Sequence, residues 1–261
     1  MGIAEAVKNG FALSGKLMKV VTIFFVFNLI MGLVSLPFAN PENAGQPGIA
    51  LISFLLSLVF FAIFIFLQGG ALGMAKDVYK KGVANISDFS AYGKKYYGRI
   101  LGLLLLYIAI GLVLALLLVL GGSGVLALAD NAITRTIITA IAILVVLVTI
   151  ILFLFPLYSI VTEENSVIQA FKKGVKVGRE NFWKVLGLFL VLVFISVIIS
   201  IIVGFIVGLV TVPMPFTASQ ILITIANSVV QAYIPIVMML ALMGYYMGLI
   251  KQQESSEGLT A

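Results

Sequence analysis

The sequence contains no cysteine and no histidine, and it has only 16 basic and 10 acidic residues in a chain of 261. Without cysteine the chain can form no disulfide, hold no iron–sulfur cluster and use no thiol nucleophile. Without histidine it lacks an imidazole base and the commonest metal ligand. These absences remove most of the side chains on which enzymes and metalloproteins depend.

The few acidic residues do not form a catalytic pattern either. A hydrolase needs a nucleophile with a base, paired carboxylates or a metal ion. Glu163, Glu164 and Glu180 lie in or beside one polar segment, and we expect Asp77 and Asp88 in a solvated loop. We therefore predict that the protein is not an enzyme, with no catalytic residues, no cofactor and no metal site.

Hydrophobic residues, by contrast, make up 62% of the chain, and the mean hydropathy is +1.22. A soluble domain of this size cannot bury so much apolar surface. A membrane-spanning helix needs about 20 apolar residues, and the following six stretches qualify: Leu17–Phe38, Ile49–Ala75, Ile100–Leu120, Ala132–Val161, Val185–Val212 and Ser219–Ile250. The sequence predicts an all-α integral membrane protein with six transmembrane helices.

Basic residues lie almost entirely on one side of these stretches. Only Arg135 is near the turns expected at 39–48, 121–134 and 211–219; the others are at the N-terminus, in two long polar segments or at Lys251. The positive-inside rule then predicts a multi-pass protein of the cell membrane with both termini in the cytoplasm. The first apolar run is longer than a signal-peptide core, so we expect it to be retained.

The most polar long segment, from Glu163 to Leu188, has helical spacing with one apolar face. Asn165 or Ser166 can cap its start. Its basic residues are Lys172, Lys173, Lys176 and Arg179. We expect this segment to be an amphipathic helix on the anionic inner leaflet of the bilayer. Because the positive-inside rule accounts for the charge, no nucleic-acid partner is implied.

Parts of the chain resemble one another and indicate a three-fold repeat of surface helix plus hairpin. The segment 99–103 (RILGL) matches 184–188 (KVLGL), and each follows a basic segment that ends in two aromatic residues. A weaker copy at 6–10 (AVKNG) resembles 170–174 (AFKKG). Such repeats in one orientation would be related by an axis along the membrane normal. The alternative is that any membrane hairpin with a basic inner loop has this pattern.

The segment 169–188 (QAFKKGVKVGRENFWKVLGL) also resembles a known family. It is similar to the membrane domain associated with glycerophosphoryl diester phosphodiesterases, in Ala170-Phe171, in Arg179–Asn181 and in Trp183-Lys184. The resemblance implies a six-helix membrane fold. This chain has no phosphodiesterase catalytic domain, so the resemblance lends it no activity.

Polar residues within the apolar stretches are the remaining candidates for a functional site. Asn28 lies in the first stretch, and Asn227, Gln231 and Pro235 follow one another at intervals of four in the sixth. Proline removes a backbone hydrogen bond and leaves a carbonyl for another partner. The candidate intramembrane polar site is therefore Asn28, Asn227 and Gln231. It could line a solute or lipid path, or it could only form hydrogen bonds between helices.

Other segments are expected to be irregular. We predict turns at Gly121–Gly124 and at Pro213–Pro215, an N-cap at Ser87, and a disordered tail at 252–261 after a single membrane domain at 1–251. For function, the first hypothesis is a non-enzymatic membrane protein that acts as a scaffold, lipid-interacting or accessory component, with an unidentified membrane protein partner. The alternative is a small-solute or lipid transporter or channel that uses the polar stripe.

Overall fold

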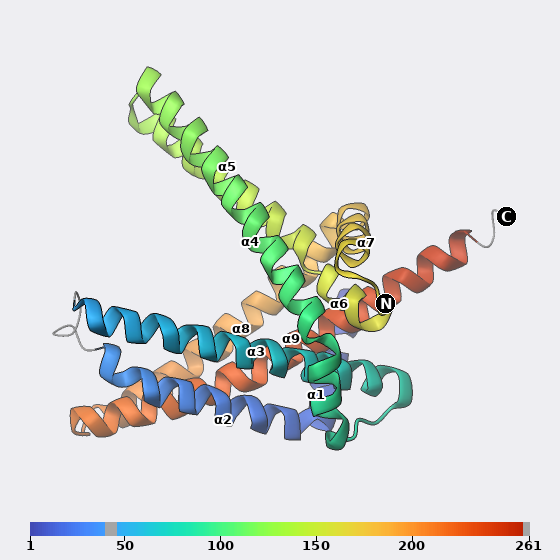
Figure 1. The fold of residues 1–261 in the computed structure, drawn as a ribbon, viewed down its shortest axis with the longest axis horizontal. Coiled ribbons are helices and arrows are strands. Elements are labelled where there is room, and N and C mark those ends of the chain that lie inside the picture. The colour runs from blue at the N-terminus through green and yellow to red at the C-terminus, as the bar shows by residue number, and fades with distance from the viewer. Residues whose placement is uncertain (40–45, 258–261) are drawn as a thin grey trace. The chain divides into compact units, whose positions relative to one another are not determined.

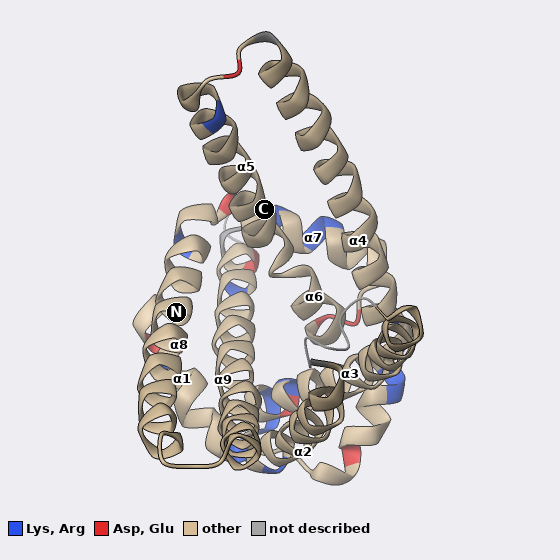
Figure 2. Ribbon diagram, turned by 90° about the vertical axis from the view of Figure 1, so that its left-hand side faces the viewer, with Lys and Arg blue, Asp and Glu red and all other residues tan. Residues whose placement is uncertain are grey.

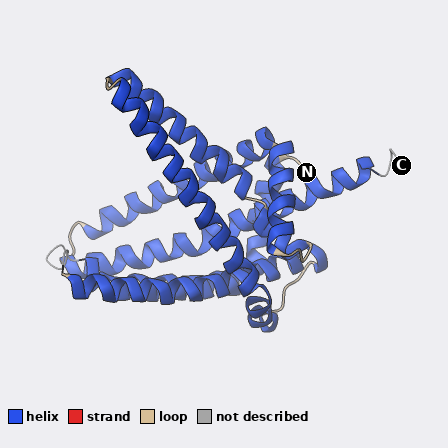
Figure 3. Ribbon diagram, turned by 45° about the horizontal axis from the view of Figure 1, so that its top comes forward, coloured by secondary structure: helices blue, strands red, loops and turns tan. Residues whose placement is uncertain are grey.

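The computed structural model describes residues 1–39 and 46–257, and within these ranges it contains helices and no strands (Figure 3). The helices are α1 (Ile3–Ser14), α2 (Met18–Ser35), α3 (Pro47–Lys81), α4 (Phe89–Leu128), α5 (Ala132–Phe153), α6 (Pro156–Thr162), α7 (Val167–Glu180), α8 (Phe182–Thr211) and α9 (Phe216–Glu257). Short 3₁₀ helices occupy Gly15–Leu17, Leu36–Ala39 and Ile86–Asp88.

Six helical stretches are long and apolar enough to cross a membrane. They correspond to the six predicted spans, and the fold class is confirmed as all-α. Figure 2 shows that α8 and α9 carry no charge over most of their length. Backbone groups in hydrocarbon must be satisfied within the segment, which favours continuous helices of this kind. The protein is a multi-pass membrane protein.

Two expected boundaries are wrong. The glycine-rich run Gly121–Gly124 lies inside α4, which continues to Leu128, and the turn falls at 129–131. Glycine costs only about 1 kcal/mol in a helix, less than leaving backbone groups unpaired in an apolar medium. The N-cap of the 3₁₀ helix at Ile86–Asp88 is Asn85, whose side chain accepts a hydrogen bond from the Ser87 N–H at 3.2 Å. Ser87 is therefore inside that helix.

The other predicted irregular segments have mixed outcomes. The turn at Pro213–Pro215 lies between α8 and α9, as predicted. The turn at 39–48 falls mostly outside the described residues, which resume at Gln46 before Pro47 begins α3. The tail expected to be disordered from Gln252 is helical as far as Glu257, because α9 extends past Lys251, and residues 258–261 lie outside the described part.

The chain forms two compact units, Met1–Tyr97 with Gly187–Ala261 (unit 1) and Gly98–Leu186 (unit 2). In unit 1, α9 packs against α2 and α3, which also contact each other, and these three helices lie together in Figure 1. Unit 2 contains most of α4 together with α5, α6 and α7. That the chain acts as a single membrane domain stays a prediction.

The short helix α1 packs against α9 through small residues. Ala6, Gly10 and Ser14 recur at intervals of four and are all buried. A Cβ atom at Gly10 would lie 2.8 Å from the carbonyl oxygen of Val237, so the two backbones are in close contact. The hydroxyl groups of Ser14 and Tyr233 lie 3.1 Å apart and share a hydrogen bond.

The helix α7 packs in the same way against the break between α5 and α6. Its buried residues are Ala170, Gly174, Val177 and Gly178. A Cβ atom at Gly174 would overlap the backbone of Pro156, which begins α6. Proline fixes this break, since it cannot donate the hydrogen bond that would continue α5.

The first turns of α4 contact the second half of α3. A Cβ atom at Gly93 would lie 2.7 Å from the ring of Phe66. The Tyr92 hydroxyl donates a 2.6 Å hydrogen bond to Asp77. These contacts make the start of α4 the counterpart of α1 and α7.

The three segments that precede the outgoing helices, α1, the start of α4 and α7, thus each pack against a returning helix. The start of α4 contacts α3 and α7 contacts α5 and α6, while α1 contacts α9, the last helix of the chain. Ala6 and Gly10 occupy the places that Ala170 and Gly174 have in the sequence repeat, and all four are buried. The repeated residues are therefore the packing residues, which supports the three-fold repeat.

A second feature recurs after the first two hairpins. Gly82 and Glu164 both have left-handed backbone angles, with φ of 77° and 61°. The carbonyl of Gly82 accepts a hydrogen bond from the Lys16 ammonium at 2.8 Å, and the carbonyl of Glu164 accepts one from the Arg99 guanidinium at 2.9 Å. In each hairpin, a basic residue just before or within the outgoing helix donates a hydrogen bond to the loop that follows the returning helix.

Candidate functional site: an amide-lined cavity between α2, α3 and α9

A cavity of about 470 Å³ lies in unit 1 between α2, α3 and α9. Its volume is within the range of small-molecule sites, about 300–1,000 Å³. The lining side chains are mostly aromatic, with a few amides: Phe24, Phe27, Asn28, Met31, Ser57, Phe60, Phe61, Phe64, Gln68, Gln231 and Pro235. No charged residue is among these lining residues.

Three amide side chains from three helices line this cavity. Asn28 on α2 is buried, with 9% of its surface exposed, whereas Gln68 on α3 is half-buried and Gln231 on α9 is exposed. None of the three has a hydrogen-bond partner among residues 1–39 and 46–257. Among the described residues no fully buried side-chain nitrogen or oxygen atom lacks a partner, so the amide atoms of Asn28 are still accessible to a ligand. The cavity therefore concentrates unused donors and acceptors.

Pro235 adds a backbone acceptor to the same place. Proline has no N–H, so the carbonyl four residues earlier in the helix loses its usual donor. That carbonyl belongs to Gln231, which also lines the cavity. Ser57 adds less, because its hydroxyl already donates a 2.8 Å hydrogen bond to the carbonyl of Ser53.

The aromatic part of the lining is formed by packed phenylalanine rings. The rings of Phe24 and Phe64 lie 6.4 Å apart edge to face, and those of Phe27 and Phe60 lie 6.0 Å apart in the same arrangement. Edge-to-face pairs add about 0.5–1.5 kcal/mol beyond the area that they bury. The amides are therefore set in an apolar wall held by ring contacts between α2 and α3.

The amides lie deep along their helices. Asn28 follows Lys19 by nine residues and Gln68 precedes Lys76 by eight, which at 1.5 Å per residue corresponds to about 13 and 12 Å along the helix axes. The hydrocarbon core of a bilayer is about 30 Å thick. If the lysines mark the membrane boundary, the amides are near the middle of the hydrocarbon.

The structure brings together two of the three residues predicted for the intramembrane site. Asn28 and Gln231 both line the cavity, whereas Asn227 is exposed one turn away on the same face of α9 and is not part of the lining. Gln68 was not among the predicted site residues, although it lies within the predicted stretch Ile49–Ala75. The helix α3 continues to Lys81, so Gln68 is an interior residue. A glutamine so far inside an apolar helix is the signal that could have found it.

The basic residues predicted on the surface of α7 do not all behave alike. Lys172, Lys176 and Arg179 are exposed. Lys173 is partly buried, and its ammonium forms an ion pair with Glu163. Glu163 is the C-cap of α6, so this ion pair links the end of α6 to α7. An exposed basic face is therefore formed by three of the four residues.

The expectation that Asp77 lies in a solvated loop is wrong. Asp77 is in α3, and only 5% of its surface is exposed. Its carboxylate accepts the Tyr92 hydrogen bond and lies 3.0 Å from the Lys81 ammonium. These partners satisfy the carboxylate, which links α3 to the start of α4. Within the described ranges, no three acidic side chains group together as a metal site would require.

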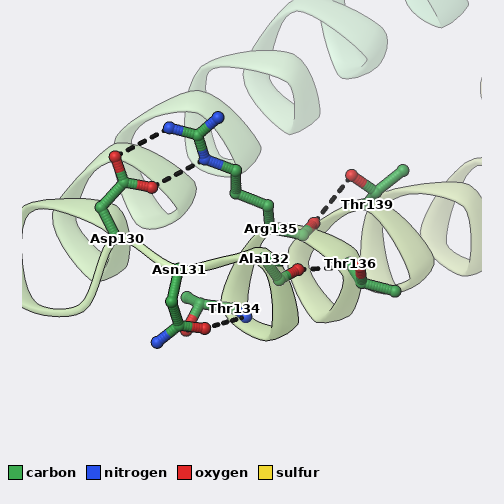
Figure 4. Close-up of polar contacts among 7 residues, drawn as sticks. All are labelled: Asp130, Asn131, Ala132, Thr134, Arg135, Thr136 and Thr139. Carbon is green, nitrogen blue, oxygen red and sulfur yellow. Dashed lines mark hydrogen bonds and ion pairs between the residues drawn. The ribbon is translucent and has the colours of Figure 1, made fainter.

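In unit 2, the turn between α4 and α5 contains a local cluster of polar residues (Figure 4). The Arg135 guanidinium forms two hydrogen bonds to the Asp130 carboxylate, at 2.7 and 2.8 Å. This pairing lowers the pKa of Asp130 below its ordinary value. Asn131 caps α5 by accepting from the Thr134 N–H at 2.9 Å. Helix capping and charge neutralisation account for these residues.

Comparison with known proteins gives one positive result. Residues 6–249 match the model of a family described as a domain of unknown function, DUF7847. No curated protein and no solved structure matches the chain.

Proposed function

Because the chain belongs to the DUF7847 family of domains of unknown function, its role has to be inferred from the cavity, and we propose that the protein binds a neutral, membrane-dissolved ligand between α2, α3 and α9. The observation that supports this proposal is the set of unpartnered amides of Asn28, Gln68 and Gln231 in a phenylalanine-lined cavity. Such a cavity suits a largely apolar molecule with one hydrogen-bonding group.

The chemistry of the lining limits the class of ligand. With no charged side chain in the lining, an ionic headgroup would be desolvated without compensation, which is costly in an apolar medium. The amides are also deeper than the level at which phospholipid headgroups lie. The best fit is a lipid whose polar group is a carbonyl or a hydroxyl that resides within the hydrocarbon.

A comparison of bound lipids in two single variants tests this proposal. Wild-type protein, Asn28→Leu and Asn227→Leu would be purified in a mild detergent, and the lipids that remain bound would be quantified by mass spectrometry. We expect a neutral lipid in the wild type and a fivefold to tenfold loss, roughly the value of one hydrogen bond, in Asn28→Leu. Asn227→Leu, on the same face but outside the lining, should retain the lipid.

Misfolding would not explain such a loss. Asn28 has no hydrogen-bond partner among the described residues, so leucine leaves no other group unpaired and should not lower stability. If the wild type retains only phospholipids in bilayer proportions, or if Asn28→Leu retains as much neutral lipid as the wild type, the proposal is wrong.

One observation favours transport as the second candidate. Asn227 extends the polar face of Gln231 and Pro235 by one turn towards the end of α9 that begins at Phe216. A path for a water-soluble solute would need water at this depth. In the cysteine-free chain, Gln231→Cys would react with a small hydrophilic thiol reagent if water reached it. We expect no reaction in reconstituted vesicles, and reaction would favour a channel or transporter.

The proposal also includes the location of the protein in the cell and its class. The protein would act in the cell membrane with both termini in the cytoplasm, as the distribution of basic residues predicts, and it would not be an enzyme. The exposed basic face of Lys172, Lys176 and Arg179 would contact the anionic leaflet. The similarity to the membrane domain of glycerophosphoryl diester phosphodiesterases concerns architecture and adds no activity. That the protein binds an unidentified membrane protein partner remains a separate prediction.

A further inference from the structure

A second pocket, distinct from the amide-lined cavity, lies at the basic end of unit 1, and we propose that it binds the phosphate group of an anionic phospholipid. The pocket has a volume of about 280 Å³ and lies between the α1–α2 junction and the loop after α3. Its lining includes Lys16, Lys19, Ala84 and Asn85.

The polar side chains of the pocket supply hydrogen-bond donors. Lys16 and Lys19 contribute two ammonium groups, and no acidic residue is among the lining residues. The Lys16 ammonium is fixed by its 2.8 Å hydrogen bond to the carbonyl of Gly82 and keeps two protons for a ligand. Asn85 accepts the Ser87 N–H with its side-chain oxygen, which leaves the NH₂ group of the amide free to donate.

The loop backbone adds further donors. The loop residues 83–85 belong to no helix, and the N–H groups of Ala84 and Asn85 have no hydrogen-bond partner within the described residues. Two cations, one amide and free backbone N–H groups together form a constellation that suits an anion with several acceptor oxygens. A phosphate group has this chemistry.

The position of the pocket favours a lipid as the source of the phosphate. Lys16 and Lys19 adjoin the start of α2, and Leu17 and Met74 in the lining are buried apolar residues. A phospholipid headgroup is held at this level of a bilayer, with its acyl chains extending towards the hydrocarbon. The same donors could also hold a soluble phosphate, and the experiment has to separate the two sources.

A charge-matched pair of variants tests the site. Asn85→Asp keeps the oxygen that caps the 3₁₀ helix but replaces the free NH₂ group with negative charge. Ser90→Asp adds the same charge at an exposed residue outside the lining. Binding of phosphatidylglycerol to the full chain would be titrated by native mass spectrometry. We expect Asn85→Asp to weaken the binding of the most tightly held lipid by about tenfold or more. Ser90→Asp should change this affinity by less than about twofold.

A second pair of variants tests the same pocket while leaving Asn85, the cap of the 3₁₀ helix, unchanged. Lys16→Gln with Lys19→Gln removes two charges from the pocket, whereas Lys80→Gln with Lys94→Gln removes two exposed charges outside the lining. Only the first pair should lose the tight site. If both pairs, or both aspartate variants, weaken binding equally, the protein has only general surface attraction and the proposal is wrong.

Soluble competitors identify the source of the phosphate. Glycerol 3-phosphate or inorganic phosphate at millimolar concentration should leave the bound phosphatidylglycerol in place. Displacement by either one would overturn the assignment to a lipid and indicate a soluble phosphate ligand. None of these outcomes depends on the neutral lipid in the amide-lined cavity, so the two proposals can fail separately.

Discussion

Glu164 is the one residue other than glycine with a left-handed backbone in the part of the chain that the structure describes. Its φ of 61° corresponds to a conformation that costs about 1–2 kcal/mol for a residue with a Cβ atom. The equivalent position after the first hairpin is Gly82, where the conformation carries no such cost. Glu164 is thus a strained position, and the sequence repeat does not reveal this strain.

A pair of substitutions isolates this backbone strain. Glu164→Ala removes the side chain and keeps the Cβ atom, whereas Glu164→Gly removes both. We expect Glu164→Gly to be more stable than Glu164→Ala by about 1 kcal/mol, measured as the free energy of unfolding in detergent micelles. Because both variants lose the side chain, its own interactions cancel. Equal stability of the two variants would show that the loop relaxes without cost.

The amides show what single residues reveal by sequence alone. Asn28 and Gln231 were conspicuous because each is polar within an apolar stretch, and both line the cavity. Gln68 has the same chemistry but was not among the predicted site residues, and Asn227 has the same spacing but lies outside the lining. Residue type identifies the candidates, whereas the rotation of each helix decides which of them meet.

At the scale of the element, α7 is held by the packing of its small residues. Its buried residues are Ala170, Gly174, Val177 and Gly178, whereas the larger apolar residues Phe171 and Val175 are only half-buried. Small residues allow two backbones to approach closely, and they are enriched where helices of membrane proteins pack together. Within unit 2, α7 is therefore held against the α5–α6 break.

Substitution of Gly174 separates protein packing from lipid attraction. A Cβ atom at Gly174 would overlap the Pro156 backbone, so Gly174→Ala should lower the free energy of unfolding by about 1–3 kcal/mol. It should also speed amide hydrogen exchange in α7. Gly98→Ala is the matched control, because a Cβ atom there meets nothing within 4 Å, and it should be neutral or slightly stabilising.

The basic face of α7 provides the contrasting variant. Replacing Lys172, Lys176 and Arg179 with glutamine should leave hydrogen exchange in α7 unchanged, since none of the three is buried. Attraction to anionic vesicles should fall by about 1 kcal/mol for each charge removed and depend less on salt. Faster exchange in the triple variant than in Gly174→Ala would show that lipid, not protein packing, holds the helix.

At the scale of the whole molecule, the distribution of charge predicts the orientation in the membrane. Ser90 lies near basic residues Lys94 and Lys95, whereas Ser123 lies towards the turn that precedes α5. In the cysteine-free chain, Ser123→Cys should react with an impermeant thiol reagent outside intact cells, and Ser90→Cys should not. Labelling of Ser90→Cys from outside, without permeabilisation, would reverse the predicted orientation.

The sequence by itself determined the class of the protein. Long apolar stretches have few alternatives to membrane-spanning helices, because every backbone group in hydrocarbon must be satisfied within the segment. Local composition was therefore enough to predict the six membrane-spanning stretches, which the long helices of Figure 1 contain, whereas the break at Pro156 within the predicted stretch Ala132–Val161 was not predicted. The Ala–Gly spacing of the repeat also corresponds to observed packing, since 6 and 10 match 170 and 174.

Only the tertiary structure decided which residues meet. The burial of Asp77, the pairing of Lys173 with Glu163 and the convergence of Asn28, Gln68 and Gln231 all join residues from different elements or across a turn. An apolar helix in a membrane has no hydrophobic face to fix its rotation, because lipid tails are as apolar as its neighbours. Its rotation is set by close contacts such as those of Gly10, Gly93 and Gly174, and these contacts turn scattered amides into a cavity.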